Sequence, residues 1–159
     1  MTDADRTEVA EFIARHWGST KVMSCGKVYY PADLEGLIER RDGEIVGLLT
    51  MVAQNDSLEI LTLNSTLEGH RIGSSLMLEA LEIARRRGIR RVWLTTTNDN
   101  MRAIGLYQRL GFRIVEVHPN AVDEARRIKP EIPEVGQDGI PIHDEIVLAL
   151  TLHPYSESS

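Results

Sequence analysis

Residues Leu67 to Ser75, LEGHRIGSS, place two glycines and two serines directly before an amphipathic segment. The first N–H groups of a helix have no partner inside the helix, and the helix dipole favours negative charge there. Gly69 and Gly73 let the backbone come close to a ligand, and Ser74 and Ser75 add hydroxyl donors. The pattern indicates a site for a phosphate or pyrophosphate. An ordinary helix start, with glycine for tight packing, is the alternative.

Two further side chains are of types that move protons. Glu59 lies on a predicted strand that leads into this loop, in phase with Leu61 and Leu63. Burial of a carboxyl group among apolar side chains raises its pKa, which suits a general base; a solvated glutamate near a strand start is the alternative. Tyr107 shares the inward face of a predicted helix with Ala103. A phenol is protonated at neutral pH and can act as an acid, but the position also fits a core tyrosine.

The other reactive residue types form weaker patterns. The five histidines show no metal-ligand spacing, so we expect no metal. Cys25, the single cysteine, permits neither an internal disulfide nor a multi-cysteine metal site, and no base can be assigned to it. His143, Asp144 and Glu145 could hold a cationic amine, and a polar strand start with loop anchors is the alternative.

Helices and strands of ordinary length position these residues. The apolar spacing predicts a helix over about 4–17, and turn signals such as Asp42-Gly43 separate the strands that follow. A β-α-β unit comes next and predicts two parallel strands with a right-handed crossover. The expected strands are 34–41, 44–53, 57–64, 91–97, 112–118 and 145–152, and the expected further helices are 72–87, 100–110 and 121–128. Residues 119–142, which contain four prolines, otherwise look like a long ordered loop of the kind that is often functional.

Length and charge exclude several classes of protein. A chain of 159 residues suits one domain, here 1–159, and it has no apolar run long enough to span a membrane. The formal net charge of −6 disfavours nucleic acid as a partner. The acidic N-terminus lacks the order of a secretory signal, so we expect a cytoplasmic protein. The loop also lacks the Lys-Ser/Thr pair of a P-loop and the GxGxxG of a Rossmann site.

Two motifs together resemble the GCN5-related N-acetyltransferase (GNAT) family. The signature Asn-x-x-Ala-x-x-x-Tyr-x-x-x-Gly-Phe is complete at Asn100, Ala103, Tyr107, Gly111 and Phe112. The loop pattern Gln/Arg-x-x-Gly-x-Gly/Ala matches in part, with Glu68 first, Arg71 at the first glycine and Gly73 last. The resemblance covers residues 44–118, and the tail, with its KPxIP and GIPIxDE motifs, looks like that of a subgroup of the family.

The resemblance implies the fold and the cofactor. The fold would be the acyl-CoA N-acyltransferase fold, an α/β fold with a mixed, mostly antiparallel sheet, a central parallel strand pair and flanking helices. Acetyl-CoA would be the co-substrate, with its pyrophosphate on the loop, its pantetheine beside the strand that ends at Leu63 and its thioester near Tyr107. The implied cofactor-binding residues are Leu61, Leu63, Gly69, His70, Arg71, Ile72, Gly73, Ser74, Asn100 and Ala103.

The implied activity is acetyl transfer from acetyl-CoA to a primary amine of a small molecule or peptide by direct attack. Glu59 would be the base, directly or through a water chain, and Tyr107 the acid at the leaving sulfur. The backbone N–H of Leu63 would stabilise the oxyanion, as in relatives where a break in that strand frees an amide. A non-catalytic acyl-CoA-binding or sensing module on the same fold is the alternative. Relatives often pair, so a homodimer is a further expectation.

Overall fold

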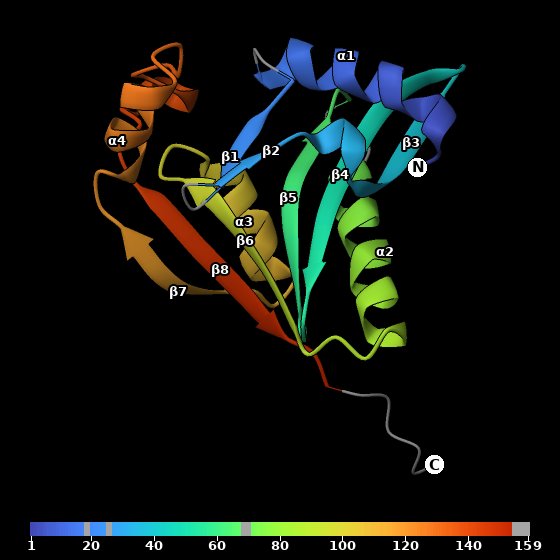
Figure 1. Cartoon of the computed structure of the whole chain (residues 1–159). Helices are drawn as coiled ribbons and strands as arrows, with labels where there is room; N and C mark the ends of the chain where they lie inside the picture. Colours follow the sequence, from blue (N-terminus) through green and yellow to red (C-terminus); the bar gives the residue numbers. More distant parts are fainter. Residues whose placement is uncertain (18–19, 25–26, 68–70, 154–159) are drawn as a thin grey trace. The chain divides into compact units, whose positions relative to one another are not determined.

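The computed structural model describes residues 1–17, 20–24, 27–67 and 71–153 (Figure 1). The helices are α1 (Arg6–Trp17), α2 (Ile72–Arg86), α3 (Met101–Arg109) and α4 (Ala121–Ile128). The strands are β1 (Val22–Ser24), β2 (Lys27–Tyr29), β3 (Glu35–Arg41), β4 (Glu44–Gln54), β5 (Ser57–Ser65), β6 (Arg91–Thr97), β7 (Arg113–His118) and β8 (Glu145–Thr151). The predicted elements are confirmed, with ends that differ by one or two residues, whereas the hairpin of β1 and β2 was not predicted.

The chain forms two compact units. The first runs from Met1 to Val92 and includes the C-terminal residues from Thr151, and the second runs from Trp93 to Leu150. In the first unit, β3, β4 and β5 are consecutive antiparallel strands. The turn between β3 and β4 is the predicted Asp42-Gly43 turn, and both of its residues have positive φ.

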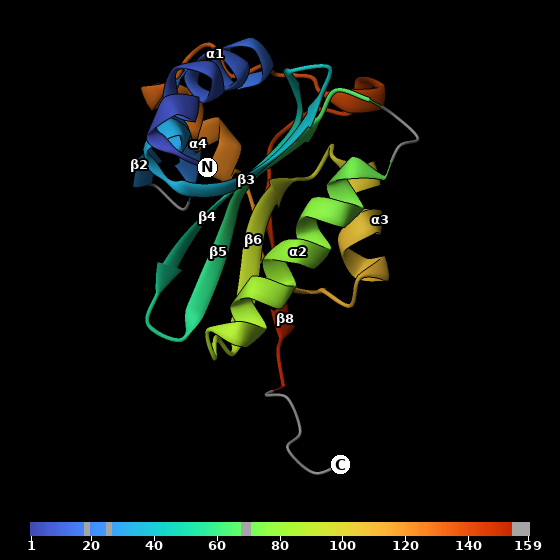
Figure 2. The same cartoon turned by 90° about the vertical axis from the view of Figure 1, so that its right-hand side faces the viewer.

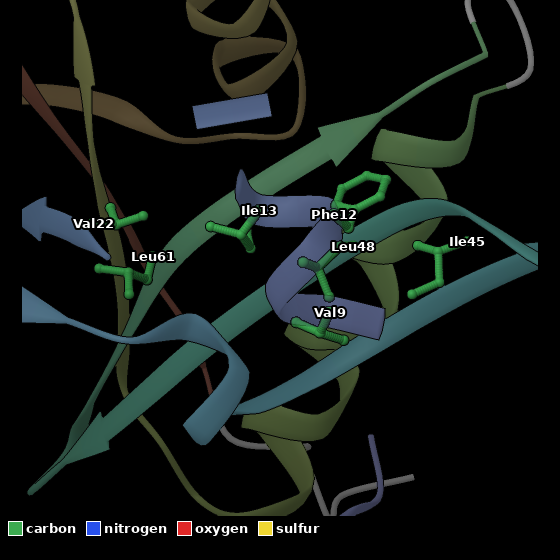
Figure 3. Close-up of a cluster of buried hydrophobic side chains, with 7 residues drawn as sticks. All are labelled: Val9, Phe12, Ile13, Val22, Ile45, Leu48 and Leu61. Atoms are coloured by element: carbon green, nitrogen blue, oxygen red, sulfur yellow. The ribbon is translucent and has the colours of Figure 1, made fainter. Parts of the chain in front are cut away.

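The core of the first unit lies beneath α1. Figure 3 shows the apolar side chains of this helix packed against side chains of β1, β4 and β5; the cluster is Val9, Phe12, Ile13, Val22, Ile45, Leu48 and Leu61. The spacing of the α1 residues explains this, because residues three or four apart share one face of a helix. The cluster therefore joins the N-terminal helix to the strand that carries Glu59.

The helix α2 packs on β3, β4 and β5 (Figure 2) and buries one face along its length. Its buried residues recur at helical spacing, as predicted; they are Ile72, Leu76, Met77, Ala80, Leu81 and Ala84. At the C-terminal end of α2, Arg87 donates two hydrogen bonds to the carboxylate of Glu35 on β3, at 2.6 and 2.7 Å. This ion pair ties the C-terminal end of α2 to β3.

The second unit contains β6, α3, β7, α4 and β8, with the strands in the order β6-β8-β7. The strands β7 and β8 are antiparallel, and Val115 has no partner in their register. Between α4 and β8, the chain makes a short 3-10 turn at Gln137–Gly139 and an isolated bridge between Val135 and Pro141. The predicted long loop is therefore ordered.

The predicted α/β fold class, a mixed and mostly antiparallel sheet with one parallel strand pair and flanking helices, is confirmed. The pairings of β1 with β2, β3 with β4, β4 with β5 and β7 with β8 are antiparallel. The segments β5, α2 and β6 follow one another as the predicted β-α-β unit. In the part of the chain that the structure describes, no helix has both the length and the apolarity needed to cross a membrane. The assignment of residues 1–159 to a single domain stays a prediction.

Candidate active site

The start of α2 presents free backbone donors. Arg71 is the N-cap residue, and its carbonyl accepts the N–H of Ser75 at 3.0 Å. The N–H groups of Ile72, Gly73 and Ser74 in the first turn have no acceptor within the helix, because helical bonds begin only four residues further on. Together with the helix dipole, these donors suit a phosphate oxygen. Gly69 and His70, also predicted to bind the cofactor, lie outside the described residues.

Arg71 explains why the family pattern has glycine at this position. Its backbone is left-handed, with φ 53° and ψ 26°. Residues other than glycine adopt this conformation only at a cost in free energy, since the Cβ atom crowds the neighbouring carbonyl. Arg71 therefore keeps the left-handed backbone conformation that glycine adopts easily. Its exposed side chain adds a positive charge at the N-terminus of α2.

The entrance to the loop is fixed to β4. Val46 has no partner in the register of β3 and β4, and its carbonyl accepts the N–H of Thr66 at 2.9 Å. The next residue on β4, Gly47, faces α2, where a Cβ would overlap a methyl group of Ile72 and approach Leu76 at 3.1 Å. Gly47 thus allows the first turn of α2 to lie directly on the strand. The sequence analysis missed this role, although a glycine inside an apolar strand is a known sign of close backbone approach.

We expect Gly47→Ala to weaken acetyl-CoA binding about tenfold and to cost roughly 1–3 kcal/mol of unfolding free energy. The added methyl group must push the first turn of α2 away from β4, which moves the N–H groups of Ile72, Gly73 and Ser74. Titration calorimetry with acetyl-CoA and thermal unfolding measure the two effects.

Val9→Ala is the matched control for Gly47→Ala. Val9 is fully buried in the cluster under α1, so this change also costs stability but leaves α2 in place. If both variants lose affinity equally, the loss reflects general destabilisation and Gly47 has no specific role.

Glu59 is buried in the middle of β5, with 6% of its surface exposed. The hydroxyl of Ser24 on β1, itself 7% exposed, donates a hydrogen bond of 2.5 Å to its Oε2 atom. Burial raises the pKa of the Glu59 carboxyl, while the Ser24 hydrogen bond and the charge of Lys27 oppose the rise. A carboxyl group with a raised pKa, held in one orientation, has the properties of a general base. Ser24 was not predicted, because no local pattern links it to a residue 35 positions away.

The strand β5 is irregular at Leu61. Thr62 pairs with Thr50 and Ile60 pairs with Met51, so Leu61 has no partner in the register. Leu63, named as the source of the oxyanion N–H, is paired with Leu49 instead. This pairing concerns only the β4 side of Leu63, so the assignment of the oxyanion N–H to Leu63 stays a prediction. The side chain of Leu61 is buried in the cluster under α1.

In the second unit, Asn100 is the N-cap residue of α3. Its carbonyl accepts the N–H of Ile104 at 3.0 Å, and its side-chain amide donates to the hydroxyl of Thr96 at 3.1 Å. Ala103 is half-buried one turn further on. The predicted cofactor-binding residues of the signature thus lie on the first turn of one helix.

Tyr107 is buried on the same helix, with 6% of its surface exposed. Gly111, with φ 104°, turns the chain so that Phe112 returns to Tyr107: the Phe112 N–H donates to the Tyr107 carbonyl at 2.9 Å, and the two ring centroids lie 6.0 Å apart. This contact explains the spacing Tyr-x-x-x-Gly-Phe. Burial raises the pKa of the Tyr107 phenol to about 12, so the group stays protonated at neutral pH.

The predicted site residues fall into two groups, one in each unit. Those of the first unit are Glu59, Leu61, Leu63, Arg71, Ile72, Gly73 and Ser74, and those of the second are Asn100, Ala103 and Tyr107. The residues of the first unit lie on β5 and at the start of α2. Those of the second unit lie on α3 and its N-cap. Their roles stay predictions.

The polar residues of the tail serve as anchors in the structure. The ring Nδ1 of His143 lies 3.0 Å from both carboxylate oxygens of Asp123, and Asp144 accepts the N–H of Asn120 at 2.9 Å. Burial raises the pKa of Glu145 at the start of β8. These contacts match the loop-anchor alternative, while the binding of a cationic amine here stays a prediction. Among residues 1–17, 20–24, 27–67 and 71–153, no cluster of His, Cys, Asp and Glu is arranged to hold a metal ion.

A family model supports the resemblance seen in the motifs. The model described as "Acetyltransferase (GNAT) family" matches residues 8–112. This range contains Glu59, the start of α2 and the complete Asn-to-Phe signature. It ends before the tail, whose subgroup motif therefore stays a resemblance.

Relatives and solved structures agree with the family model. The uncharacterised protein YxbD of Bacillus subtilis is 39% identical over 145 residues, 91% of each chain. A streptothricin acetyltransferase of Streptomyces lavendulae is 40% identical over 76 residues, 45% of this chain and 40% of that protein. An IAA acetyltransferase from Bacillus cereus has a TM-score of 0.65 and 26% identity, over 74% of this chain and 78% of that one. A GNAT acetyltransferase from Elizabethkingia anophelis with acetyl-CoA bound has a TM-score of 0.61 and 24% identity, over 72% and 74%.

Proposed function

The chain belongs to the acetyltransferase (GNAT) family, and we propose that it moves the acetyl group of acetyl-CoA onto a primary amine of a small molecule or peptide by direct attack. It is an acetyltransferase with acetyl-CoA as co-substrate. The observation that carries the proposed mechanism is Glu59, a buried carboxyl group with a raised pKa and a fixed orientation.

The reaction requires an amine with a free electron pair. Glu59 takes one proton from the ammonium form of the acceptor, directly or through water. The amine nitrogen then attacks the thioester carbon, the C–N bond forms, the C–S bond breaks, and the nitrogen loses its second proton to solvent. The products are the N-acetylated amine and coenzyme A, and no covalent intermediate forms on the protein. A backbone N–H of β5 at the carbonyl oxygen stabilises the developing negative charge.

Tyr107 is proposed to stabilise the leaving sulfur. A thiol has a pKa of about 8.5, whereas burial raises the Tyr107 pKa to about 12. Complete transfer of the phenol proton to the thiolate is therefore unfavourable. The phenol instead donates a hydrogen bond to the sulfur as negative charge develops on it, and solvent supplies the final proton. A hydrogen bond to a charged group contributes about 1.5–3 kcal/mol.

The acceptor class follows from chemistry and one relative. Glu59 suits an amine that is protonated at neutral pH, since such an amine must lose a proton before it can attack. The Streptomyces relative is named for streptothricin, which supports a small-molecule acceptor, but the matched segment covers less than half of either chain. A peptide amine is the second acceptor class. A homodimer also stays a prediction.

Incubation with acetyl-CoA and a panel of amines tests the proposed function. We expect mass spectrometry to find one acetyl group on at least one small-molecule or peptide amine, together with an equal amount of free coenzyme A. Coenzyme A released without any acetylated amine would indicate hydrolysis. Binding of acetyl-CoA with no transfer to any member of the panel would favour the acyl-CoA-sensing alternative.

A further inference from the structure

We propose that the tail segment Gly136–Asp144 is a brace that fixes the start of α3, with Asn98 and Asp99 as the positioning residues on which it acts. The brace sets the position of Asn100 and, through the helix, of Tyr107. The effect on turnover depends on the role proposed above for Tyr107, whereas the effect on the helix does not. This assigns a task to the GIPIxDE motif, which the proposed function leaves unused.

The first contact of the brace is made by Asp99, which is 5% exposed at the start of α3. Its Oδ1 atom accepts the hydroxyl of Thr97 at 2.5 Å, and its Oδ2 atom accepts the backbone N–H of Gln137 at 3.1 Å. A Cβ on Gly136 would overlap this same Oδ2 atom and would lie 2.8 Å from Ile142. The glycine therefore allows the tail backbone to lie directly on the buried carboxyl group.

The second contact is made by Asn98, whose side chain binds the other end of the brace. Its Oδ1 atom accepts the backbone N–H groups of His143 and Asp144, at 2.9 and 3.0 Å, and its Nδ2 atom donates to the carbonyl of Pro141 at 2.8 Å. The backbone N–H of Asn98 donates to the carbonyl of Asp144 at 3.1 Å. The side chain of Asn98 thus supplies hydrogen-bond partners to three backbone groups of the tail, at Pro141, His143 and Asp144.

The third contact reaches the signature itself. The Gln137 side chain donates to the Oδ1 atom of Asn100 at 3.3 Å. That oxygen belongs to the side chain that the family motif assigns to cofactor binding. The tail therefore contacts each residue of the run Asn98-Asp99-Asn100 through different atoms.

Arg126 on α4 anchors the far side of the segment. Its side chain is 14% exposed and donates to the carbonyls of Ile132, Pro133 and Ile142, at 3.2, 2.6 and 2.7 Å. The same guanidinium pairs with Asp123 at 2.7 Å. Because the segment is held on both sides, it has less conformational freedom than a free loop. It can therefore fix the position of α3, whereas a free loop would move instead of the helix.

A double-mutant cycle tests the brace. Gly136→Ala should lower kcat about tenfold, because the methyl group displaces Asp99, and Asp99→Ala should lower it by a similar factor. In the double variant the carboxyl group that the methyl group meets is gone, so we expect about a tenfold loss in total rather than a hundredfold one. Glu134→Gln, an exposed position in the same tail, is the control and should keep the wild-type rate.

Hydrogen exchange gives a readout that does not need activity. The amides at the start of α3, such as Ile104, should exchange at least tenfold faster in Gly136→Ala and Asp99→Ala, while those of α2 stay unchanged. If the wild type acetylates no amine, the proposed function fails and exchange alone still decides on the brace.

Unchanged exchange in α3 or fully independent losses in the cycle would overturn the proposal. Faster exchange with an unchanged kcat would confirm the effect of the brace on the helix and contradict its effect on turnover. If Gly136→Ala and Asp99→Ala do not fold, Gln137→Ala decides. It removes only the bond from an exposed side chain to Asn100, and it should lower kcat a few-fold. A wild-type kcat for Gln137→Ala would then count against the brace.

Discussion

Glu59→Gln should lower kcat at neutral pH by about 100- to 10,000-fold, the range that general-base catalysis contributes. The amide of glutamine keeps the size of the side chain and can still accept the Ser24 hydroxyl, but it cannot take a proton. The residual reaction needs an amine already deprotonated in solution, so the pH at half-maximal rate should rise toward the pKa of the free amine, about 10.4 for a lysine-like amine. Rate measurements across pH test both expectations.

The same variant should fold more stably than the wild type at neutral pH. Burial raises the Glu59 pKa in the folded chain, so ionisation costs folding free energy. The wild type therefore has its full stability below the pKa of Glu59 in the unfolded chain. It loses stability as the pH rises through the raised pKa of Glu59 in the folded chain. Glutamine never ionises, so its advantage in Tm should appear at neutral pH and vanish in acid.

Glu44→Gln, an exposed position at the start of β4, is the control for Glu59→Gln and should change neither rate nor Tm. A Glu59→Gln variant with the wild-type pH–rate profile would remove Glu59 from the mechanism.

Tyr107→Phe should lower kcat about 10- to 150-fold, with little change in the affinity for acetyl-CoA. The figure follows from losing one hydrogen bond to a charged sulfur, worth about 1.5–3 kcal/mol. The ring remains, so its packing against Phe112 and the fold of α3 are kept. Steady-state kinetics and calorimetry separate the two effects.

The pH profile distinguishes Tyr107 from Glu59. Because burial raises the Tyr107 pKa to about 12, the phenol does not titrate in the range where rates are measured, and Tyr107→Phe should lower the rate without changing its pH dependence. Tyr30→Phe, an exposed position, is the control. A rate for Tyr107→Phe equal to that of the control would assign Tyr107 to the core alone.

Local patterns were sufficient to predict α1 to α4 and β3 to β8, but not the paired strands β1 and β2. The stripe from Gly73 to Ala84 predicts α2 because a helix buries one face, and that face is buried. Asp42-Gly43 predicts the hairpin because its backbone needs positive φ at both positions. The sequence left the Glu59 side chain either buried in phase with Leu61 and Leu63 or solvated, and the structure shows it buried.

The contacts that complete the site join residues far apart in the sequence, and no local pattern predicts them. Ser24 reaches Glu59 from a separate hairpin, and Gly136 lies against Asp99 from the tail. The bulge at Leu61 depends on the register of two strands, which no local pattern shows. Gly47 came closest to being predictable, because a glycine in an apolar strand requires a neighbour that approaches its backbone.

Titration calorimetry of the folded protein with acetyl-CoA tests directly whether the backbone N–H groups at the start of α2 bind the pyrophosphate of the acyl donor. We expect saturable binding at one site per chain, about tenfold weaker in Gly47→Ala and unchanged in Val9→Ala. The absence of any binding heat with acetyl-CoA or coenzyme A at several temperatures would contradict it.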